Sequence, residues 1–243
     1  MKERPVMAPS TSHGGTARRA TSVAAGIYRD LRTDIVTLRR KPGDPISEKQ
    51  ISEAYGVSRT PVREAVLKLA DEGLVEIFPQ SGTFVARIPV AALPEATVIR
   101  KALEDATVRL AAERATRSQI AQLRANLERQ REQDAADDAD GFHESDELFH
   151  ALIAEIAGYP GFWTLTQQVK VQVDRCRRLT LPAPGRIGKV IAEHQEIADA
   201  IADHDPDRAV AHLNSHLDAL DVTIDDFRHA APIYFTGVLE SVR

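Results

Sequence analysis

One stretch of the sequence, residues 46–85, constrains the fold more than any other because its pattern changes twice along its length. A short helix is predicted to begin at Glu48, with Ser47 as its N-cap. One side of this helix carries residues at the spacing of a buried face: Ile51, Ala54 and Tyr55. Gly56 then breaks the pattern, and glycine readily adopts the left-handed conformation that a tight turn between two helices requires.

A second helix is predicted directly after this turn. Thr60 is its predicted N-cap and Pro61 its first residue, because proline disfavours the helical conformation in the residue before it; Ser58 is the alternative cap. Its inward side is apolar: Val62, Ala65, Val66, Leu69 and Ala70. Two apolar runs, 74–78 and 83–87, are separated by turn-forming residues and predict a β-hairpin. Helix, turn, helix and hairpin in this order predict a winged helix-turn-helix.

The exposed side of the second helix is basic near its start. In a helix-turn-helix that binds DNA, this helix enters the major groove and its first residues contact base edges. Arg59 and Arg63 are four residues apart, and an arginine can donate two hydrogen bonds to one guanine. Thr60 and the amides at the helix start suit a phosphate. Two arginines alone would be an ordinary solvated face, but with the turn and the hairpin they favour DNA binding.

The charge of the chain is divided between its two parts. The net charge is −5, yet residues 1–88 hold 14 Lys and Arg against 10 Asp and Glu, whereas residues 89–243 hold 17 against 26. A basic front and an acidic back are typical of a DNA-binding head on a body that does not bind DNA. The one cysteine, Cys176, cannot form an intramolecular disulfide. No apolar run is long enough for a membrane span, so a cytoplasmic protein without membrane association is expected.

The chain is predicted to contain four segments: a disordered arm (1–20), the winged helix-turn-helix (21–88), a helical domain (91–229) and an unassigned tail (230–243). The head opens with a helix at 21–40, whose apolar stripe consists of Ile27, Leu31, Ile35 and Leu38. No strand is predicted from Ala91 onward. Six helices are predicted there, at 93–115, 117–134, 142–157, 161–179, 186–204 and 206–227. Their short connections predict a mostly α fold with a C-terminal antiparallel bundle.

The run GVSRTPVREAVLKLADEGLV resembles the recognition helix and flanks of the GntR family of bacterial transcription regulators, over about residues 28–87. This resemblance implies that Arg59, Thr60 and Arg63 contact DNA. Lys49 stands where the family usually has an arginine, a change that keeps the charge but loses the two-pronged guanidinium. Gly82 matches the glycine at the tip of the family's wing.

The second part resembles the FCD ligand-binding domain of the FadR branch of that family, over about residues 93–227. The resemblance is carried by RKALEDATVRLAA, DELFHALIAEIAGYPGF, EHQEIADAI and HLNSHL. It departs at Tyr159, where the family often has asparagine. The resemblance implies that residues 91–229 bind an effector, and we expect them to supply dimerisation.

Four polar residues on the predicted bundle helices form a candidate metal site. Asp146 and His150 are four residues apart, so they project from the same face of one helix, and His194 and His216 lie on two others. Three imidazoles and a carboxylate suit a divalent transition metal such as Zn, Ni, Mn or Fe. Any single histidine is more often a surface or core residue, but the four together match the metal-binding set of many FCD domains. His212, four residues before His216, is an alternative ligand.

Three arginines are candidates for binding a carboxylate effector at an open position of that metal: Arg100, Arg175 and Arg178. The resemblance places Arg100 in the cavity of the domain. At most two of the three are expected to face inward, since a surface ion pair is the commoner fate of an arginine.

The resulting hypothesis is a homodimeric transcription regulator and not an enzyme. A small organic acid would bind near the metal, change the spacing of the two heads and thereby alter affinity for a palindromic DNA operator. Two alternatives stay open: a metal-dependent hydrolase, in which the metal activates water, and a regulator that senses the metal itself. The sequence leaves open whether DNA binding represses or activates transcription.

Overall fold

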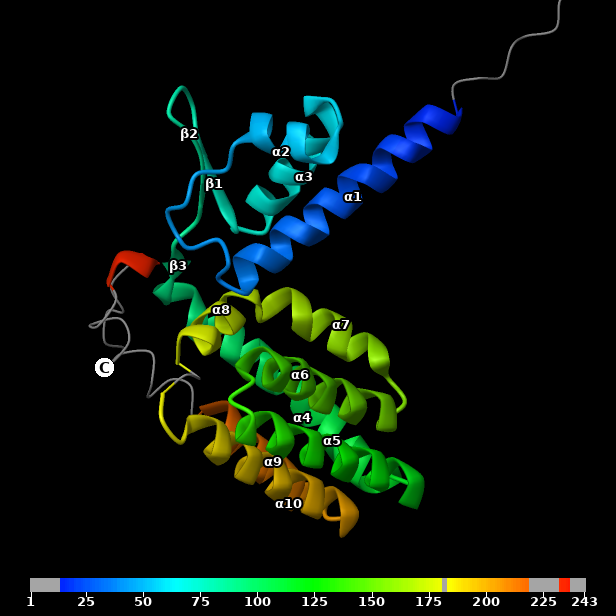
Figure 1. The fold of residues 1–243 in the computed structure, drawn as a ribbon. Coiled ribbons are helices and arrows are strands. Elements are labelled where there is room, and N and C mark those ends of the chain that lie inside the picture. The colour runs from blue at the N-terminus through cyan, green and yellow to red at the C-terminus, as the bar shows by residue number, and fades with distance from the viewer. Residues whose placement is uncertain (1–13, 181–182, 219–231, 237–243) are drawn as a thin grey trace, which may run out of the picture. The chain divides into compact units, whose positions relative to one another are not determined.

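The computed structural model describes residues 14–180, 183–218 and 232–236, and it divides into two compact units that meet between Ala86 and Arg87 (Figure 1). The elements of the first unit are α1 (Gly14–Val36), α2 (Glu48–Tyr55), α3 (Arg59–Asp71), β1 (Val75–Phe78) and β2 (Gly82–Val85). The second unit begins with β3 (Ile88–Pro89) and a short 3-10 helix (Val90–Ala92), and ends with a 3-10 helix (Pro232–Tyr234) and β4 (Phe235–Thr236). Between them lie α4 (Leu93–Arg114), α5 (Arg117–Ala135), α6 (Ala139–Ile156), α7 (Pro160–Val169), α8 (Val171–Thr180), α9 (Arg186–Ala202) and α10 (Pro206–Asp218).

The long helix α1 packs against α3 to form the core of the first unit. Ile27, Leu31 and Ile35 of its predicted stripe are buried. Leu38 departs from the prediction because α1 ends at Val36 and Leu38 adopts a left-handed backbone angle, φ 59°. The helix also begins at Gly14, so residues 14–20 are helical and the predicted disordered arm is wrong there; residues 1–13 lie outside the described residues.

The turn between α2 and α3 follows the predicted glycine pattern. Gly56 has φ 63° and its N–H bonds to carbonyls of the preceding helix turn. The prediction of Thr60 as N-cap is wrong, because α3 begins at Arg59 and the alternative, Ser58, occupies the cap position. Pro61 is therefore the third helical residue. Its missing N–H has no cost there, since the first turn of a helix has no intrahelical acceptors for its N–H groups.

The predicted hairpin is confirmed, with slightly shorter strands. β1 and β2 pair antiparallel, with Val75 opposite Val85 and Phe78 opposite Gly82. The connection takes positive backbone angles at Gln80 (φ 65°) and at Gly82 (φ 118°), and a φ of 118° is a conformation that favours glycine.

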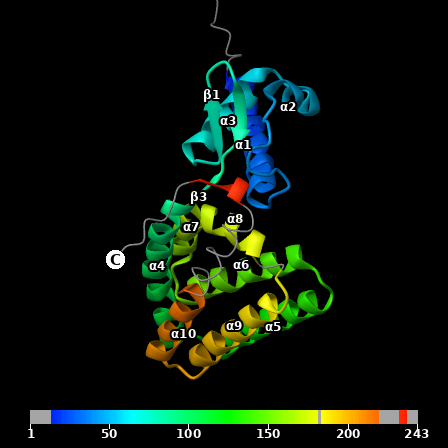
Figure 2. The same cartoon turned by 90° about the vertical axis from the view of Figure 1, so that its left-hand side faces the viewer.

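Five helices of the second unit pack as a closed ring, in the order α4, α10, α9, α5, α6 and back to α4, while α7 lies against α4 and α6 (Figure 2). Each ring helix contributes fully buried apolar side chains to one core: Val108, Leu213, Ile197, Leu127 and Phe149. Burial of such a side chain stabilises the fold by roughly 1.5–3 kcal/mol. The ring therefore holds its five inner faces, and any polar residue on them, in fixed positions.

The helix predicted at 161–179 is wrong as a single helix, because it is broken into α7 and α8. Lys170 lies at the break and is fully buried. Its ammonium is 2.5 Å from Glu147 of α6 and 2.7 Å from Asp174 of α8. This break depends on an ion pair to another helix, which leaves no trace in the apolar periodicity from which the single helix was predicted.

The tail also differs from prediction, because β4 pairs in parallel with β3. The expectation of no strand after Ala91 is therefore wrong. Phe235 is buried with Ile88 and Leu93, which explains why this pairing is retained. The last predicted helix is helical to Asp218, and residues 219–231 lie outside the described residues. No helix in the described part of the chain is long and apolar enough to cross a membrane.

Candidate DNA-binding surface and metal centre

The outer face of α3 presents the residues predicted to bind DNA. Arg59, Thr60 and Arg63 are exposed, and among the described residues neither arginine forms a hydrogen bond or an ion pair. Lys49 of α2 is also exposed, and its ammonium lies 3.9 Å from Glu53, a distance at which water screens the pair strongly. Gly82 lies at the start of β2, on the hairpin tip. This surface can offer donors to DNA without first breaking an internal bond.

The C-terminal end of α3 is anchored to α1. Glu72 accepts hydrogen bonds from the Tyr28 hydroxyl and from Arg32 Nε, the latter at 2.9 Å. Burial and the neighbouring Glu72 raise the pKa of Tyr28 to about 12, so its hydroxyl stays a donor. Lys68 stacks over the Tyr28 ring at 3.9 Å from the centroid. These contacts hold the recognition helix at a fixed angle within its own unit.

Three of the four predicted metal ligands meet in the centre of the bundle. His150 of α6, His194 of α9 and His216 of α10 are buried, and one candidate ligand atom from each lies within 4.8 Å of the others. Asp146 is next to them, with Oδ1 3.6 Å from His194 Nε2. His212 is separate, half-buried and 3.2 Å from Glu196.

Each histidine of this cluster has its Nδ1 against an oxygen from another side chain. His150 Nδ1 lies 2.6 Å from Glu104 Oε2, and His216 Nδ1 lies 2.9 Å from Glu193 Oε2. His194 Nδ1 lies 3.0 Å from Gln130 Oε1. An oxygen acceptor at Nδ1 requires the proton on that nitrogen, which leaves the lone pair on Nε2. Three Nε2 lone pairs are the donor set that a divalent transition metal prefers.

The protonation states also suit metal ligands. Burial, together with the neighbouring imidazoles, lowers the pKa of His194 and of His216 well below the ordinary 6.5. Both rings are therefore neutral, the form in which imidazole binds metals. His194 Nε2 is buried and has no hydrogen-bond partner in the part of the chain that the structure describes. An unsatisfied buried acceptor is costly, so this atom points to a group that it binds.

Asp146 is held by an arginine that the sequence analysis did not single out. Arg177 of α8 donates to both carboxylate oxygens, with both distances at 2.6 Å, and both side chains are buried. Burial alone would raise the pKa of Asp146, but the Arg177 guanidinium outweighs it and holds that pKa well below 3.8. Asp146 is thus ionised at the edge of the histidine cluster and fixed in orientation.

The three arginines predicted for the effector have different surroundings. Arg100 is buried beside the cluster, with Nε 2.5 Å from Glu104 and a terminal nitrogen 3.4 Å from His150 Nε2. Arg175 is fully buried and donates to Gln172. Arg178 pairs with the exposed Asp140 at the start of α6. Of these three, only Arg100 has a contact with the histidine cluster within the described residues.

Sequence reasoning missed Arg177, Gln130 and Glu193. Gln130 could have been found, because it continues the buried stripe of Leu123 and Leu127 at helical spacing, and a polar residue within an apolar stripe is a signal. No such signal separates Arg177 from its arginine neighbours, since three of four consecutive residues from Arg175 are arginines.

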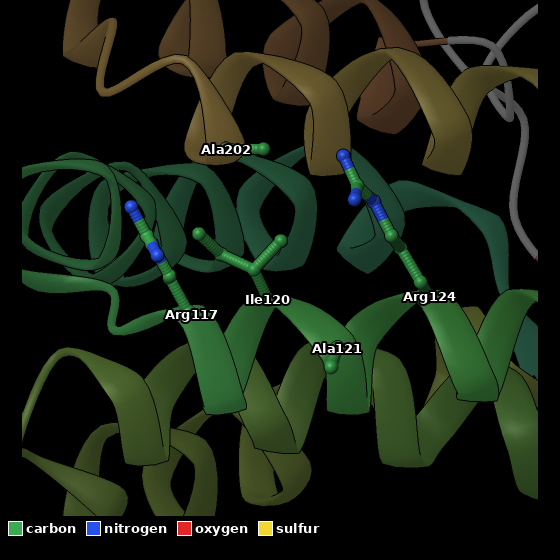
Figure 3. A pocket seen from close by; sticks show the side chains of 5 residues that line it. All are labelled: Arg117, Ile120, Ala121, Arg124 and Ala202. Carbon is green, nitrogen blue, oxygen red and sulfur yellow. The ribbon is translucent and has the colours of Figure 1, made fainter.

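A groove elsewhere on the bundle shares no residue with the cluster (Figure 3). It is lined by Arg117, Ile120, Ala121 and Arg124 of α5 and by Ala202 of α9. The two arginines stand on either side of Ile120 (Figure 3). Both are exposed, so the groove is a polar surface feature separate from the buried centre.

The winged helix-turn-helix and the separate helical domain together define a class: DNA-binding transcription regulators with an all-helical second domain. The first part matches the family of bacterial regulatory proteins called gntR over residues 23–85, and the second matches the FCD domain over residues 95–219. The chain belongs to the GntR family of bacterial transcription regulators and carries an FCD domain.

Known proteins similar to this chain are regulators along most of their length. The transcriptional repressor RspR of Escherichia coli (strain K12) is 36% identical over 210 residues, 86% of this chain and 92% of that protein. A helix-turn-helix regulator of Streptomyces ambofaciens is 35% identical over 224 residues, 92% of each. The crystal structure of a putative GntR regulator from Rhodococcus sp. RHA1 is 27% identical, has a TM-score of 0.69 and covers 86% of this chain and 98% of that chain.

Proposed function

We propose that this regulator is a cytoplasmic homodimer whose affinity for a palindromic operator is controlled by a small organic acid bound beside a metal in the helical domain. The observation that carries the proposal is the set of three buried, mutually facing histidines whose Nδ1 atoms each lie against an oxygen acceptor. Residues 91–229 would supply both effector binding and dimerisation. RspR is described as a repressor, which supports repression as the action of this chain as well.

His150, His194 and His216 would hold the metal, and Zn, Ni, Mn and Fe all suit three imidazoles. Asp146 is the proposed fourth ligand; it would share its carboxylate between the metal and Arg177. When bound, the metal would supply a Lewis-acidic position for an effector oxygen.

A carboxylate is the effector group that this centre favours. Arg100 is buried against His150, and Arg177 is buried against Asp146. A buried guanidinium forms strong, charge-assisted and often two-pronged hydrogen bonds with a carboxylate. A sugar acid or a carboxylate intermediate would satisfy both the cations and the metal. Binding would displace the ring helices and so change the spacing of the two heads.

The DNA-binding assignment predicts a base-specific effect of Arg63→Ala. Loss of a two-pronged contact to a base should weaken specific operator binding by about 1–3 kcal/mol and relax the preference at one base position. Binding is measured at constant salt on a library of operator variants. Arg39→Ala is the matched control, because Arg39 is exposed in the same unit and bonds to Asp34, away from α3. Unchanged affinity of Arg63→Ala would disprove the placement of α3 in the groove.

The metal proposal predicts that His194→Ala loses bound metal while the winged helix-turn-helix stays folded. The variant removes the buried Nε2 that has no hydrogen-bond partner in the described part of the chain, and with it one ligand of the cluster. Metal content after purification is measured by mass spectrometry, with His212→Ala as control because His212 is paired with Glu196. Full metal content in His194→Ala would place the site elsewhere. Operator affinity that follows metal concentration without any organic acid would instead make the metal the signal.

A further inference from the structure

A chain of buried polar groups links three helices of the ring and ends at His194. Asn126 Nδ2 donates to the Ser145 backbone carbonyl at 3.0 Å, and Gln130 Nε2 donates to Asn126 Oδ1 at 2.7 Å. Gln130 Oε1 then faces His194 Nδ1 at 3.0 Å. Gln130 and His194 are fully buried and Asn126 is nearly so, so water does not replace these bonds.

The direction of every bond in this chain follows from its first member. A backbone carbonyl can only accept, so the Ser145 oxygen requires the amino group of Asn126 on its side. Asn126 must then present its oxygen to Gln130, which requires the amino group of Gln130 there. Gln130 Nε2 also lies 3.4 Å from the Ser145 oxygen, which favours the same orientation. The remaining Gln130 oxygen accepts from His194, so the imidazole proton must be on Nδ1.

The two other histidines of the cluster do not need such a chain. Glu104 and Glu193 place carboxylate oxygens against His150 and His216, and a carboxylate accepts through either oxygen. An amide can present either its oxygen or its amino group. If Gln130 turned its amino group toward His194, Nδ1 would have to accept and the proton would move to Nε2, the nitrogen that faces Asp146.

We propose that Gln130 is a positioning residue, held in one orientation by Asn126 and the Ser145 carbonyl, that keeps the Nε2 lone pair of His194 directed into the cluster. This inference deepens the proposed metal site. Its role is to set the tautomer of one ligand before any metal arrives, through contacts from α5 and α6 to α9. The proton and the metal ion would otherwise compete for the same nitrogen.

Two measurements on the full-length chain test this role in Gln130→Leu. With metal removed by EDTA, ¹⁵N NMR of histidine-labelled protein should show the Nδ1–H tautomer for His194 in the parent, and loss of this single form in the variant. Zn²⁺ affinity, measured by competition with a chromophoric chelator, should fall about 10- to 100-fold, as for other residues that orient metal ligands. Gln133→Leu is the matched control, since Gln133 is a buried glutamine on the same helix whose Oε1 has no hydrogen bond in the described part of the chain. It should retain both properties.

Gln130→Glu separates positioning from simple packing. It keeps the size of the side chain and an acceptor for His194 Nδ1, so the tautomer should be retained and Zn²⁺ affinity should stay within about threefold of the parent. An Nε2–H tautomer in the parent, an unchanged tautomer and affinity in Gln130→Leu, or equal losses in Gln130→Glu and Gln130→Leu would each overturn the role. Because the tautomer is read without metal, it tests Gln130 even if the parent binds no Zn²⁺ and the proposed metal site fails.

Discussion

Arg177→Met is expected to lower the free energy of unfolding of the helical domain by about 3–5 kcal/mol, because it leaves the Asp146 carboxylate buried without its counter-charge. Asp146 is fully buried and both of its oxygens accept from Arg177 at 2.6 Å. Urea unfolding in EDTA is the measurement, so that bound metal does not contribute. Trp163 is the only tryptophan of the chain and its ring stacks on His150 at 5.8 Å, so its fluorescence reports on this domain alone.

The neighbouring residue supplies the matched control for this prediction. Arg178 pairs with Asp140, whose side chain is 81% exposed, so Arg178→Met should cost less than about 1 kcal/mol. Replacing both partners, Asp146→Leu with Arg177→Met, should recover most of the lost stability because no buried charge remains. Equal effects of Arg177→Met and Arg178→Met would contradict the ion pair as the source of the loss.

The isolated head, residues 1–88, is expected to bind operator about 10²- to 10⁴-fold more weakly than the whole chain. One head reads one half-site, and a dimer makes contact with the second half-site effectively intramolecular. The measurement is the affinity for a palindromic operator of the full chain and of the head. The head fused to an unrelated dimeric coiled coil is the control, and it should recover much of the loss. A head that binds as tightly as the full chain would exclude dimerisation through the helical domain.

The same arrangement predicts reciprocal coupling between DNA and the organic acid. A coupling free energy of about 1–3 kcal/mol is typical, and operator DNA must change the affinity for the acid by the same factor as the acid changes the affinity for DNA. Titration of the acid with and without saturating operator measures this factor. Equal affinities in both would exclude control through head spacing, even if DNA and metal binding were each established.

The winged helix-turn-helix could be read from the sequence because its determinants are local. The turn depends on the left-handed Gly56, and the register of the hairpin on alternation within two short runs. The apolar stripe of α1 likewise predicted the buried Ile27, Leu31 and Ile35. The cap of α3 was misplaced by two residues because the constraint that Pro61 puts on Thr60 was read as a boundary, whereas the first turn of a helix tolerates proline.

The buried centre was decided by contacts between helices that are distant in sequence. Helical spacing placed His150, His194 and His216 on helices, but the closure of the ring brought their rings together. Which arginine faces Asp146, and which group faces His194, depends on the rotation of α8 and α5 about their axes. Local sequence restricts that rotation only to within the width of an apolar stripe, and packing against neighbouring helices settles it. The sequence by itself therefore determined the two-part architecture and the chemistry available, while the tertiary structure alone selected Arg177 and Gln130 as the partners of the candidate ligands.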